Sequence, residues 1–169
     1  MREYLEYHPE EWTKIFKSEV NNIHFLLPKF TLNIEHIGAT SVNNCRSFRN
    51  VDILVSTHDL ADLYTVVMLL TNKEYKELKE LSNKDCVVLV KKYKYKKIGV
   101  TVRVVEYGSE TYNRIIAFKT LLQESYEKVI KYNNFRERLF VESGGDIQRY
   151  NEVKYGYINS MIDDNYRFE

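Results

Sequence analysis

The stretch that decides the fold reads Ile34-Glu35-His36-Ile37-Gly38-Ala39-Thr40-Ser41-Val42, and it is followed by Val51-Asp52-Ile53-Leu54-Val55. Residues 32–37 alternate polar and apolar side chains, which is typical of a strand, and this strand ends at Gly38. The second run is apolar except for Asp52, as expected of a central strand that carries one carboxylate. A turn of small hydroxyl-bearing residues before such a strand is a layout that can hold a phosphorylated ligand and a metal.

Helical spacing of apolar residues recurs on both sides of this stretch. It predicts helices over residues 9–27, 59–70, 110–123, 125–142 and 146–162, and β-branched runs predict an antiparallel hairpin of strands 86–90 and 98–105. The last residues, 163–169, are expected to fray. The order of elements predicts an α+β fold with a small mixed sheet and a helical C-terminal half. With no repeat or linker among its 169 residues, the chain is interpreted as one domain, 1–169.

Composition excludes a strong global electrostatic preference. The 25 Lys and Arg residues nearly balance the 24 Asp and Glu residues, so the net charge of +1 offers no field to attract nucleic acid or an anionic membrane. The two cysteines, Cys45 and Cys86, fit a reducing compartment. No signal peptide and no run of about 20 apolar residues is present. We therefore expect a cytoplasmic protein with no membrane partner.

The Gly38 turn and Asp52 are the first candidates for chemistry. A glycine lets the backbone approach a phosphate closely, and Thr40 and Ser41 can donate hydrogen bonds to its oxygens. A plain turn with polar caps would show the same residues. An acid within an apolar run is costly to bury unless a cation or hydrogen-bond donors satisfy it. Asp52 could equally face solvent or pair with Arg46 or Arg49.

The chain as a whole resembles the GrpB family of the nucleotidyltransferase superfamily. The resemblance rests on motifs in the family's order and spacing: Tyr7-His8-Pro9-Glu10-Glu11-Trp12 with Phe16 and Glu19, Glu35-His36-Ile37-Gly38-Ala39-Thr40, Val51-Asp52-Ile53, Val105-Glu106-Tyr107-Gly108-Ser109 with Arg114 and Phe118, and Tyr150 with Lys154. These motifs span nearly the whole chain.

The resemblance implies a nucleotidyltransferase fold that binds a nucleoside triphosphate and magnesium (Mg²⁺). In such enzymes two metal ions flank attack on the α-phosphate, and closely spaced carboxylates hold them. The resemblance makes Asp52 the catalytic and metal-binding residue. The residues expected to bind the nucleotide phosphates are Gly38, Ala39, Thr40, Ser41, Arg103 and Lys154.

Several departures from the family pattern bear on catalysis. Leu54 stands at the position of the superfamily's second acid, an acid that the GrpB family itself often lacks. The strand that often carries a third acid has Arg103. Ala39 replaces the signature's serine, and the loop usually rich in Pro, Gly and Lys reads Asn43-Asn44-Cys45-Arg46-Ser47-Phe48-Arg49. The family's His-x-His strand appears as Thr101-Val102-Arg103. Two-metal chemistry is therefore in question.

Other polar residues admit a functional and a structural interpretation. Arg103, inside an apolar strand, is expected to face the cleft or to form an ion pair, with Glu106 as its candidate partner or as a metal ligand. Lys154 and Tyr150 lie one helical turn apart and share a face, either toward the cleft or as an amphipathic stripe. Arg46 and Arg49 could face phosphates or solvent. His36 could orient a phosphate or Asp52, or be structural.

Lysines and tyrosines alternate between Lys92 and Lys96. Basic residues beside aromatic rings can bind single-stranded nucleic acid. We favour a lysine-protected edge hairpin and do not expect nucleic acid as a partner.

The leading hypothesis from the sequence is a GrpB-like nucleotidyltransferase that binds a nucleotide or other phosphorylated small molecule, with weakened or lost activity. The alternative is a non-catalytic ligand- or partner-binding module that keeps the fold. Convergence of Asp52, Glu106 and Glu35 would favour a shared metal, and wide separation would favour the binding module.

Overall fold

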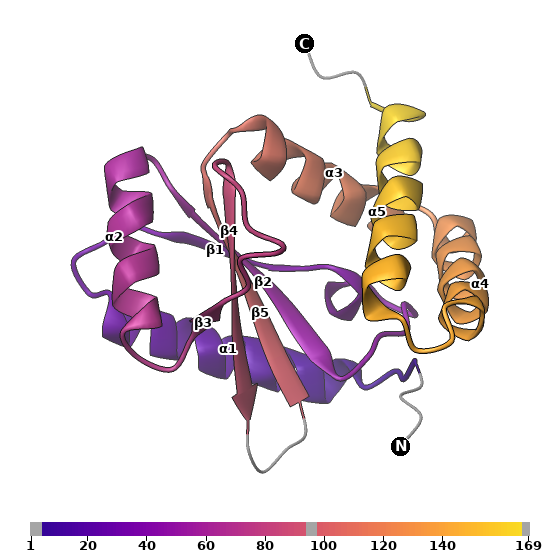
Figure 1. Ribbon diagram of the computed structural model, residues 1–169, viewed down its shortest axis with the longest axis horizontal. Helices are drawn as coiled ribbons and strands as arrows, with labels where there is room; N and C mark the ends of the chain where they lie inside the picture. Colours follow the sequence, from indigo (N-terminus) through magenta and orange to yellow (C-terminus); the bar gives the residue numbers. More distant parts are fainter. Residues whose placement is uncertain (1–4, 94–97, 167–169) are drawn as a thin grey trace.

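A five-stranded mixed sheet lies at the centre of the structure, a computed structural model that describes residues 5–93 and 98–166 (Figure 1). Its strands are β1 (Asn33–Ile37), β2 (Asn50–Thr57), β3 (Lys76–Glu77), β4 (Cys86–Tyr93) and β5 (Ile98–Glu106), in the spatial order β1-β2-β5-β4-β3. Only β2 and β5 pair in parallel among the described strands. The α+β class, the mixed sheet and the antiparallel hairpin are confirmed.

The helices begin and end close to the residues that the sequence predicts. They are α1 (Pro9–Leu26), the short 3-10 helix η1 (Ala39–Ser41), α2 (Leu60–Thr71), α3 (Glu110–Gln123), α4 (Tyr126–Glu142) and α5 (Ile147–Asp163). Side-chain oxygens of Asp59, Ser109, Ser125 and Asp146 accept hydrogen bonds from the first-turn amides of α2 to α5. These caps satisfy amides that have no partner within the helix, which fixes the starts.

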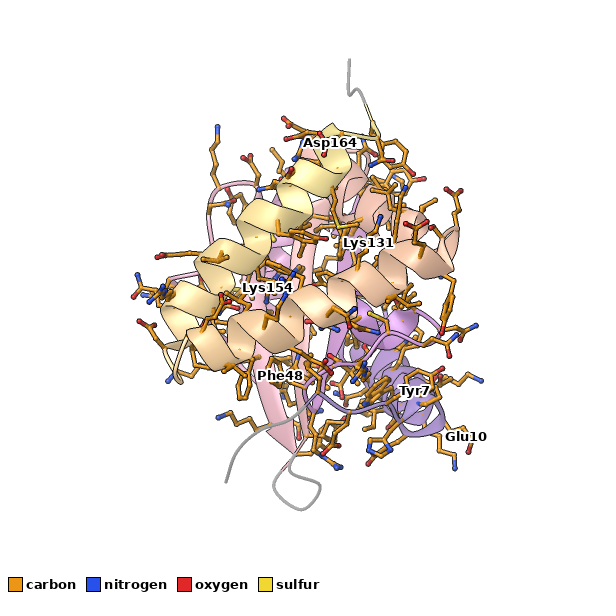
Figure 2. All side chains as sticks on the ribbon, turned by 90° about the vertical axis from the view of Figure 1, so that its right-hand side faces the viewer. Tyr7, Glu10, Phe48, Lys131, Lys154 and Asp164 are labelled. Atoms are coloured by element: carbon orange, nitrogen blue, oxygen red, sulfur yellow. The ribbon has the colours of Figure 1, made fainter. Side chains whose placement is uncertain are left out.

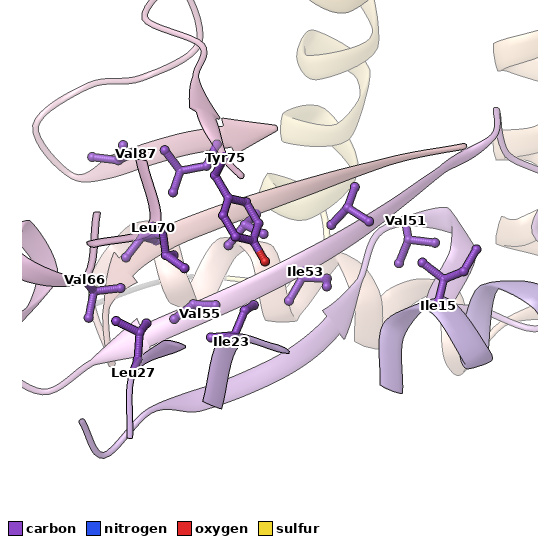
Figure 3. Close-up of a cluster of buried hydrophobic side chains, with 14 of the residues drawn as sticks. Ile15, Ile23, Leu27, Val51, Ile53, Val55, Val66, Leu70, Tyr75 and Val87 are labelled. Atoms are coloured by element: carbon purple, nitrogen blue, oxygen red, sulfur yellow. The ribbon is translucent and has the colours of Figure 1, made fainter. Parts of the chain in front are cut away.

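Helices α1 and α2 cover one face of the sheet (Figure 3). Alternate residues of β2 point to this face, so Val51, Ile53 and Val55 pack against α1 residues such as Ile15 and Ile23. Ile23, Val51, Ile53 and Val55 are fully buried. Burial of each such side chain contributes about 1.5–3 kcal/mol.

A polar cluster lies within this apolar layer around Glu19, which is fully buried. The hydroxyls of Tyr75 and Tyr93 donate to its carboxylate, and the Lys91 ammonium donates to it at 3.0 Å. Burial raises the pKa of Glu19, but these three donors outweigh burial and hold the pKa below its usual range. The cluster therefore ties α1 to β4 with a charged carboxylate.

Helices α3, α4 and α5 lie on the opposite face, which we call the Asp52 face because Asp52 and Leu54 point to it. Figure 2 shows α4 and α5 side by side in front of the sheet. Leu54 is fully buried there with Val88 and Val105, and Ile115 of α3 packs against them. An apolar side chain thus fills the position where the superfamily carries a second acid.

Strand β3 covers part of the outer edge of β4, next to the lysine-tyrosine segment that the sequence predicts as a protected edge. Strand β3 pairs with Leu89 and Val90 of β4, so β3 is the outermost strand there. A two-residue strand has no alternating pattern, and the sequence did not predict it. Lys91 and Tyr93 contact Glu19 rather than an external partner. The rest of the lysine-tyrosine segment, 94–97, lies outside the described residues.

Within the described ranges, no helix combines the length and the apolar character that crossing a membrane requires.

Candidate functional site

The Gly38 turn is built around the carboxylate of Asp52. Ile37, the last residue of β1, pairs with Asp52 across the sheet, and Gly38 follows with φ 68° and ψ −168°. This backbone conformation is almost restricted to glycine. A Cβ atom on Gly38 would lie 2.8 Å from Oδ2 of Asp52, closer than van der Waals contact allows. The glycine is therefore required both by the turn and by the neighbouring carboxylate.

The hydroxyls predicted to bind phosphate are used within the turn. The Ser41 hydroxyl donates to the Gly38 carbonyl oxygen at 2.7 Å, and Thr40 Oγ1 lies 2.9 Å from Nε2 of His36. Ala39 and Thr40 are both buried. In this arrangement the side chains of Thr40 and Ser41 support the turn, and their role as phosphate ligands remains a prediction.

His36 lies on the sheet face opposite Asp52. Its ring stacks on Phe16 of α1, with ring centroids 4.7 Å apart. Burial, together with the positive charge of Lys119, lowers the pKa of His36 to about 4, so the ring is neutral at pH 7. His36 does not contact Asp52, because the ring is directed away from it toward α1, and the stacking on Phe16 agrees with the structural interpretation.

Asn50 is the hydrogen-bond donor to Asp52. Its Nδ2 lies 3.2 Å from Asp52 Oδ1 and 3.0 Å from the hydroxyl oxygen of Thr101, on the neighbouring strand β5. Our reading of the sequence missed Asn50. The signal was present, because residues two apart on a strand share a face.

Arg46 and Arg49 do not pair with Asp52. Arg46 forms an ion pair with Glu137 of α4, and Arg49 lies within 3.4 Å of carboxylates of Glu6 and Glu11. Both arginines instead connect the loop after η1 to other parts of the molecule.

Two cations from β5 and α5 lie on the Asp52 face. The Arg103 guanidinium donates to the Tyr155 hydroxyl at 2.6 Å and stands over the Tyr155 ring. Lys154 donates to Oδ1 of Asn151 at 2.9 Å, and its ammonium lies 4.7 Å from the centre of the Tyr155 ring. The prediction that Glu106 is the partner of Arg103 is wrong, because Arg103 bonds to Tyr155 instead. No carboxylate in the described part of the chain lies within 4.0 Å of either cation.

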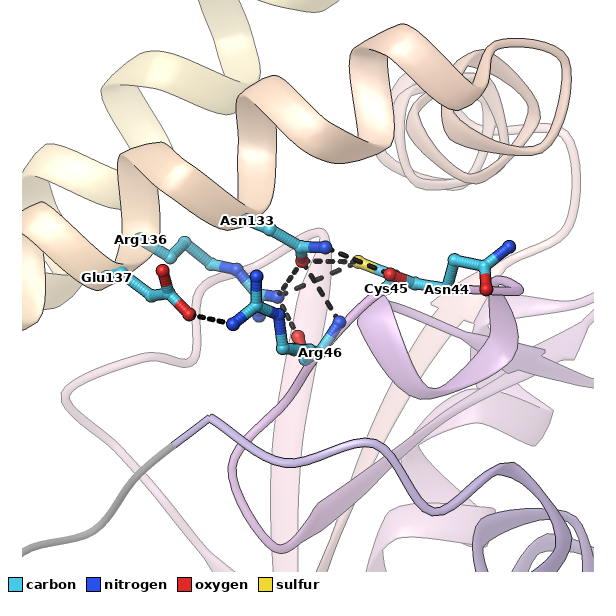
Figure 4. A network of polar contacts seen from close by, with 6 residues as sticks. All are labelled: Asn44, Cys45, Arg46, Asn133, Arg136 and Glu137. Atoms are coloured by element: carbon cyan, nitrogen blue, oxygen red, sulfur yellow. Dashed lines mark hydrogen bonds and ion pairs between the residues drawn. The ribbon is translucent and has the colours of Figure 1, made fainter.

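A third cation, Arg136 of α4, lies deeper, and its side chain locks the loop that follows η1 (Figure 4). It donates to the backbone oxygen of Arg46, while Asn133 accepts from the Arg46 amide at 3.0 Å and donates to the Asn44 carbonyl oxygen at 2.9 Å. Nε of Arg136 and the hydroxyl of Tyr150 are buried and have no hydrogen-bond partner among the described residues. No pattern in the sequence pointed to Arg136.

Electrostatics couple these groups to Asp52. Burial raises the pKa of Asp52, while the charges of Arg103, Lys154 and Arg136 oppose that rise. Burial lowers the pKa of Lys154 to about 8; the Asp52 carboxylate counteracts this, and the two arginines add to it. One carboxylate thus lies among three cations, and the local charge is positive.

The residues present do not fit a two-metal magnesium site. The Glu35 carboxylate accepts from the Tyr112 hydroxyl at 2.9 Å and lies 3.6 Å from the Lys119 ammonium. Glu106 pairs with Thr57, five residues along β2 from Asp52, which is about 16 Å at the usual strand rise. In the ranges 5–93 and 98–166, no three His, Cys, Asp or Glu side chains are grouped so as to hold a metal ion. The three acids do not converge.

Two pockets of about 290 and 280 Å³ open beside this site rather than at it. They share Asn44 and Tyr126 and are lined by the loop after η1 and the start of α4. Their lining includes Ser41 but neither Asp52 nor Lys154. We place the candidate site at Asp52 because charged groups able to bind a ligand gather there, whereas the linings of these two pockets carry one charged residue, Arg46.

Comparison with solved structures identifies the class of this fold. A chain of the Cid1 poly(U) polymerase, solved as a mutant bound to MgATP, matches with a TM-score of 0.54 and 8% sequence identity over 78% of this chain and 42% of that chain. The architecture is therefore of the nucleotidyltransferase type. The match spans less than half of the polymerase, and at this identity it shows the fold alone.

Closer relatives define the family. Residues 4–164 match the family model described as GrpB protein, and the chain therefore belongs to the GrpB family. The crystal structure of GrpB from Enterococcus faecalis matches with a TM-score of 0.78 and 22% identity, over 94% of each chain. The UPF0157 protein BH1888 of Halalkalibacterium halodurans is 25% identical over 94% of this chain and 79% of its own length. The resemblance inferred from the sequence motifs is confirmed.

Proposed function

We propose that this protein binds a nucleoside triphosphate, or another phosphorylated small molecule, on the Asp52 face. The excess of positive charge around Asp52 carries the proposal: Arg103, Lys154 and Arg136 accompany one carboxylate. Guanidinium and ammonium groups bind phosphate oxygens through charge-assisted hydrogen bonds. The nucleotidyltransferase fold supports a nucleotide as the ligand, since Cid1 has been solved with MgATP bound.

Among the two hypotheses drawn from the sequence, the geometry favours the binding module. Magnesium-dependent transfer needs carboxylates close enough to share metal ions, and Leu54 and Arg103 stand where further acids would be expected. Asp52 keeps the position of the acid that the family resemblance implies. We therefore propose ligand binding as the function. Nucleotidyl transfer is the second candidate, because Asp52 is retained.

Calorimetric titration tests the binding proposal. ATP, GTP, CTP and UTP are each titrated into the protein, and the four matching nucleosides serve as controls that lack phosphate. We expect at least one triphosphate to bind at least tenfold more tightly than its nucleoside. The proposal fails if none of the four triphosphates binds, or if the nucleosides bind equally well.

An assay with α-labelled triphosphates decides between binding and transfer. Incubation with magnesium should leave the label on the free nucleotide if the protein is a binding module. Label transferred to an acceptor by the native protein, but not by Asp52→Asn, would instead establish a nucleotidyltransferase.

A further inference from the structure

We infer that Arg103 and Lys154 take over the charge-neutralising role of magnesium on the Asp52 face, so that the protein binds its phosphorylated ligand in the metal-free form. This rests on the proposed function and specifies the ionic form of the ligand. It also follows from a difference between this protein and others of its fold. The sheet of a nucleotidyltransferase is expected to carry acids that hold metal ions, and this sheet carries cations there.

Strand register brings Arg103 to this position. β5 runs parallel to β2, with Thr101 opposite Asp52 and Arg103 opposite Leu54. Since residues two apart share a face, Arg103 points to the Asp52 face, as Asp52 itself does. The strand that would supply a further acid therefore supplies a guanidinium instead.

The partners of both cations are neutral. Arg103 is held by the Tyr155 hydroxyl and ring, and Lys154 by the Asn151 side-chain oxygen and tyrosine rings. Asp52 contributes long-range attraction, but in the described ranges it forms no ion pair within 4.0 Å. Partly buried cations that outnumber the one nearby carboxylate are costly, and phosphate oxygens would supply further negative charge. Both residues are half-buried rather than fully enclosed.

Buried polar atoms nearby also lack partners. The hydroxyl of Tyr150, one helical turn before Lys154, and Nε of Arg136 form no hydrogen bond with any residue that the structure describes. The Lys154 ammonium lies 5.4 Å from the centre of the Tyr150 ring, and the charge of Arg136 acts on Tyr150. Buried polar groups normally find a partner. The unpartnered hydroxyl of Tyr150, on the same helix as Lys154, supports a site that receives polar atoms.

The sign of the magnesium effect follows from charge. Magnesium bound to a triphosphate cancels two of its negative charges, and therefore weakens its attraction to Arg103 and Lys154. A site that holds metal through carboxylates behaves in the opposite way, because the metal joins the ligand to the acids. Magnesium should thus compete with the protein's own cations for the phosphates.

The experiment is a pair of calorimetric titrations of ATP into the full chain, one with EDTA and one with saturating magnesium chloride at matched ionic strength. We expect ATP to bind at least threefold more tightly with EDTA. Inorganic triphosphate, titrated in the same two buffers, should show the same order, because the phosphates carry the effect.

Charge variants assign the effect to residues. Lys154→Gln and Arg103→Gln should each weaken binding in EDTA at least tenfold, whereas Lys154→Arg, which keeps the charge, should retain most of it. Arg149→Gln removes one positive charge from an exposed position on the same helix and should leave binding unchanged. Circular dichroism verifies the fold of each variant. Should Arg103→Gln fail to fold, Lys154→Gln and Lys154→Arg decide the outcome.

The outcomes separate this inference from the proposed function. Binding that needs magnesium overturns the inference and leaves nucleotide binding in place. Binding in EDTA that neither Lys154→Gln nor Arg103→Gln weakens also overturns it. Absence of binding in both buffers overturns the proposed function and the inference together.

Discussion

At the scale of single residues, Gly38 and Asp52 form one unit. Strand pairing brings the Asp52 carboxylate against the turn, and the absent side chain of Gly38 leaves the space that the carboxylate fills. A glycine at a strand end is usually explained by its backbone freedom or by a bound phosphate. In this protein the side chain of Asp52 supplies a second, steric reason.

We therefore expect Gly38→Ala to destabilise the protein by more than the backbone alone explains. The positive φ angle should cost about 1–3 kcal/mol, and the contact of the new methyl group with Asp52 adds to that cost. Urea denaturation followed by circular dichroism measures the change in the free energy of unfolding.

Gly108→Ala is the matched control for Gly38→Ala. Gly108 has a similar φ of 73°, but a Cβ atom there would meet nothing within 4 Å. The double variant Gly38→Ala/Asp52→Ala should recover part of the lost stability. Equal losses in the two glycine variants would show that Asp52 does not restrict position 38.

The sequence identified Asp52, because an acid within an apolar run is visible without a structure. It did not identify Tyr155 or Asn50 as the hydrogen-bond partners on this face. Tyr155 contacts Arg103 across more than fifty intervening residues, and no local pattern specifies such a pairing. Arg103 and Lys154 were named because cationic side chains suit phosphate oxygens, and their role as ligands remains a prediction.

At the scale of elements, helix α4 fixes the loop after η1. Asn133 binds the loop backbone on both sides of Cys45, whose side chain is fully buried (Figure 4). Two backbone groups that face α4 are thus satisfied by one amide side chain. The loop begins directly after the Gly38 turn, so α4 also supports the geometry of the Asp52 face.

We expect Asn133→Ala to destabilise the protein by about 1–3 kcal/mol, because it removes the side-chain partner of two part-buried backbone groups. It should also expose Cys45 more often through local opening of the loop. In a Cys86→Ser background, the reaction rate of Cys45 with a thiol reagent such as Ellman's reagent should rise at least tenfold.

Asn134→Ala provides the control for the α4 experiment. Asn134 is the exposed neighbour on the same helix, and its side chain makes no hydrogen bond with the described residues. Its substitution should change neither stability nor the reactivity of Cys45. An unchanged reactivity of Cys45 in Asn133→Ala would show that α4 does not hold this loop in place.

At the scale of the whole molecule, both layers of helices share one sheet. Strand β2 contributes alternate side chains to the two layers, and Ile53 and Leu54 are both fully buried on opposite faces. Because a strand cannot lose one face without disturbing the other, the layers should unfold together. The expectation of a single domain, 1–169, thus becomes a measurable prediction.

We expect one cooperative unfolding transition in urea. The fluorescence of Trp12, the sole tryptophan, reports on the α1 layer, while far-UV circular dichroism is dominated by α3, α4 and α5. The two signals should change at the same urea concentration. Two separate midpoints would contradict the single-domain prediction.

Leu54→Ala tests the same prediction from within the sheet. Removing this buried side chain from the Asp52 face should cost about 2–5 kcal/mol. It should shift both signals equally, although Trp12 lies in the opposite layer. A shift of the circular dichroism alone would show that the layers unfold independently.

The sequence by itself determined the helices, the four longer strands, the α+β class and the GrpB family. Local periodicity, helix caps and the order of motifs predict those properties, and none of these patterns depends on long-range contacts. Strand β3 was not predicted, because a strand of two residues is too short to show an alternating pattern.

Only the tertiary structure decided what surrounds Asp52. Arg103, Lys154 and Arg136 come from β5, α5 and α4, and strand register and helix packing bring them to one face. The sequence could not show that cations gather where the superfamily carries acids, because charge at a site depends on distances between side chains. Those distances are set by pairings between segments far apart in the chain.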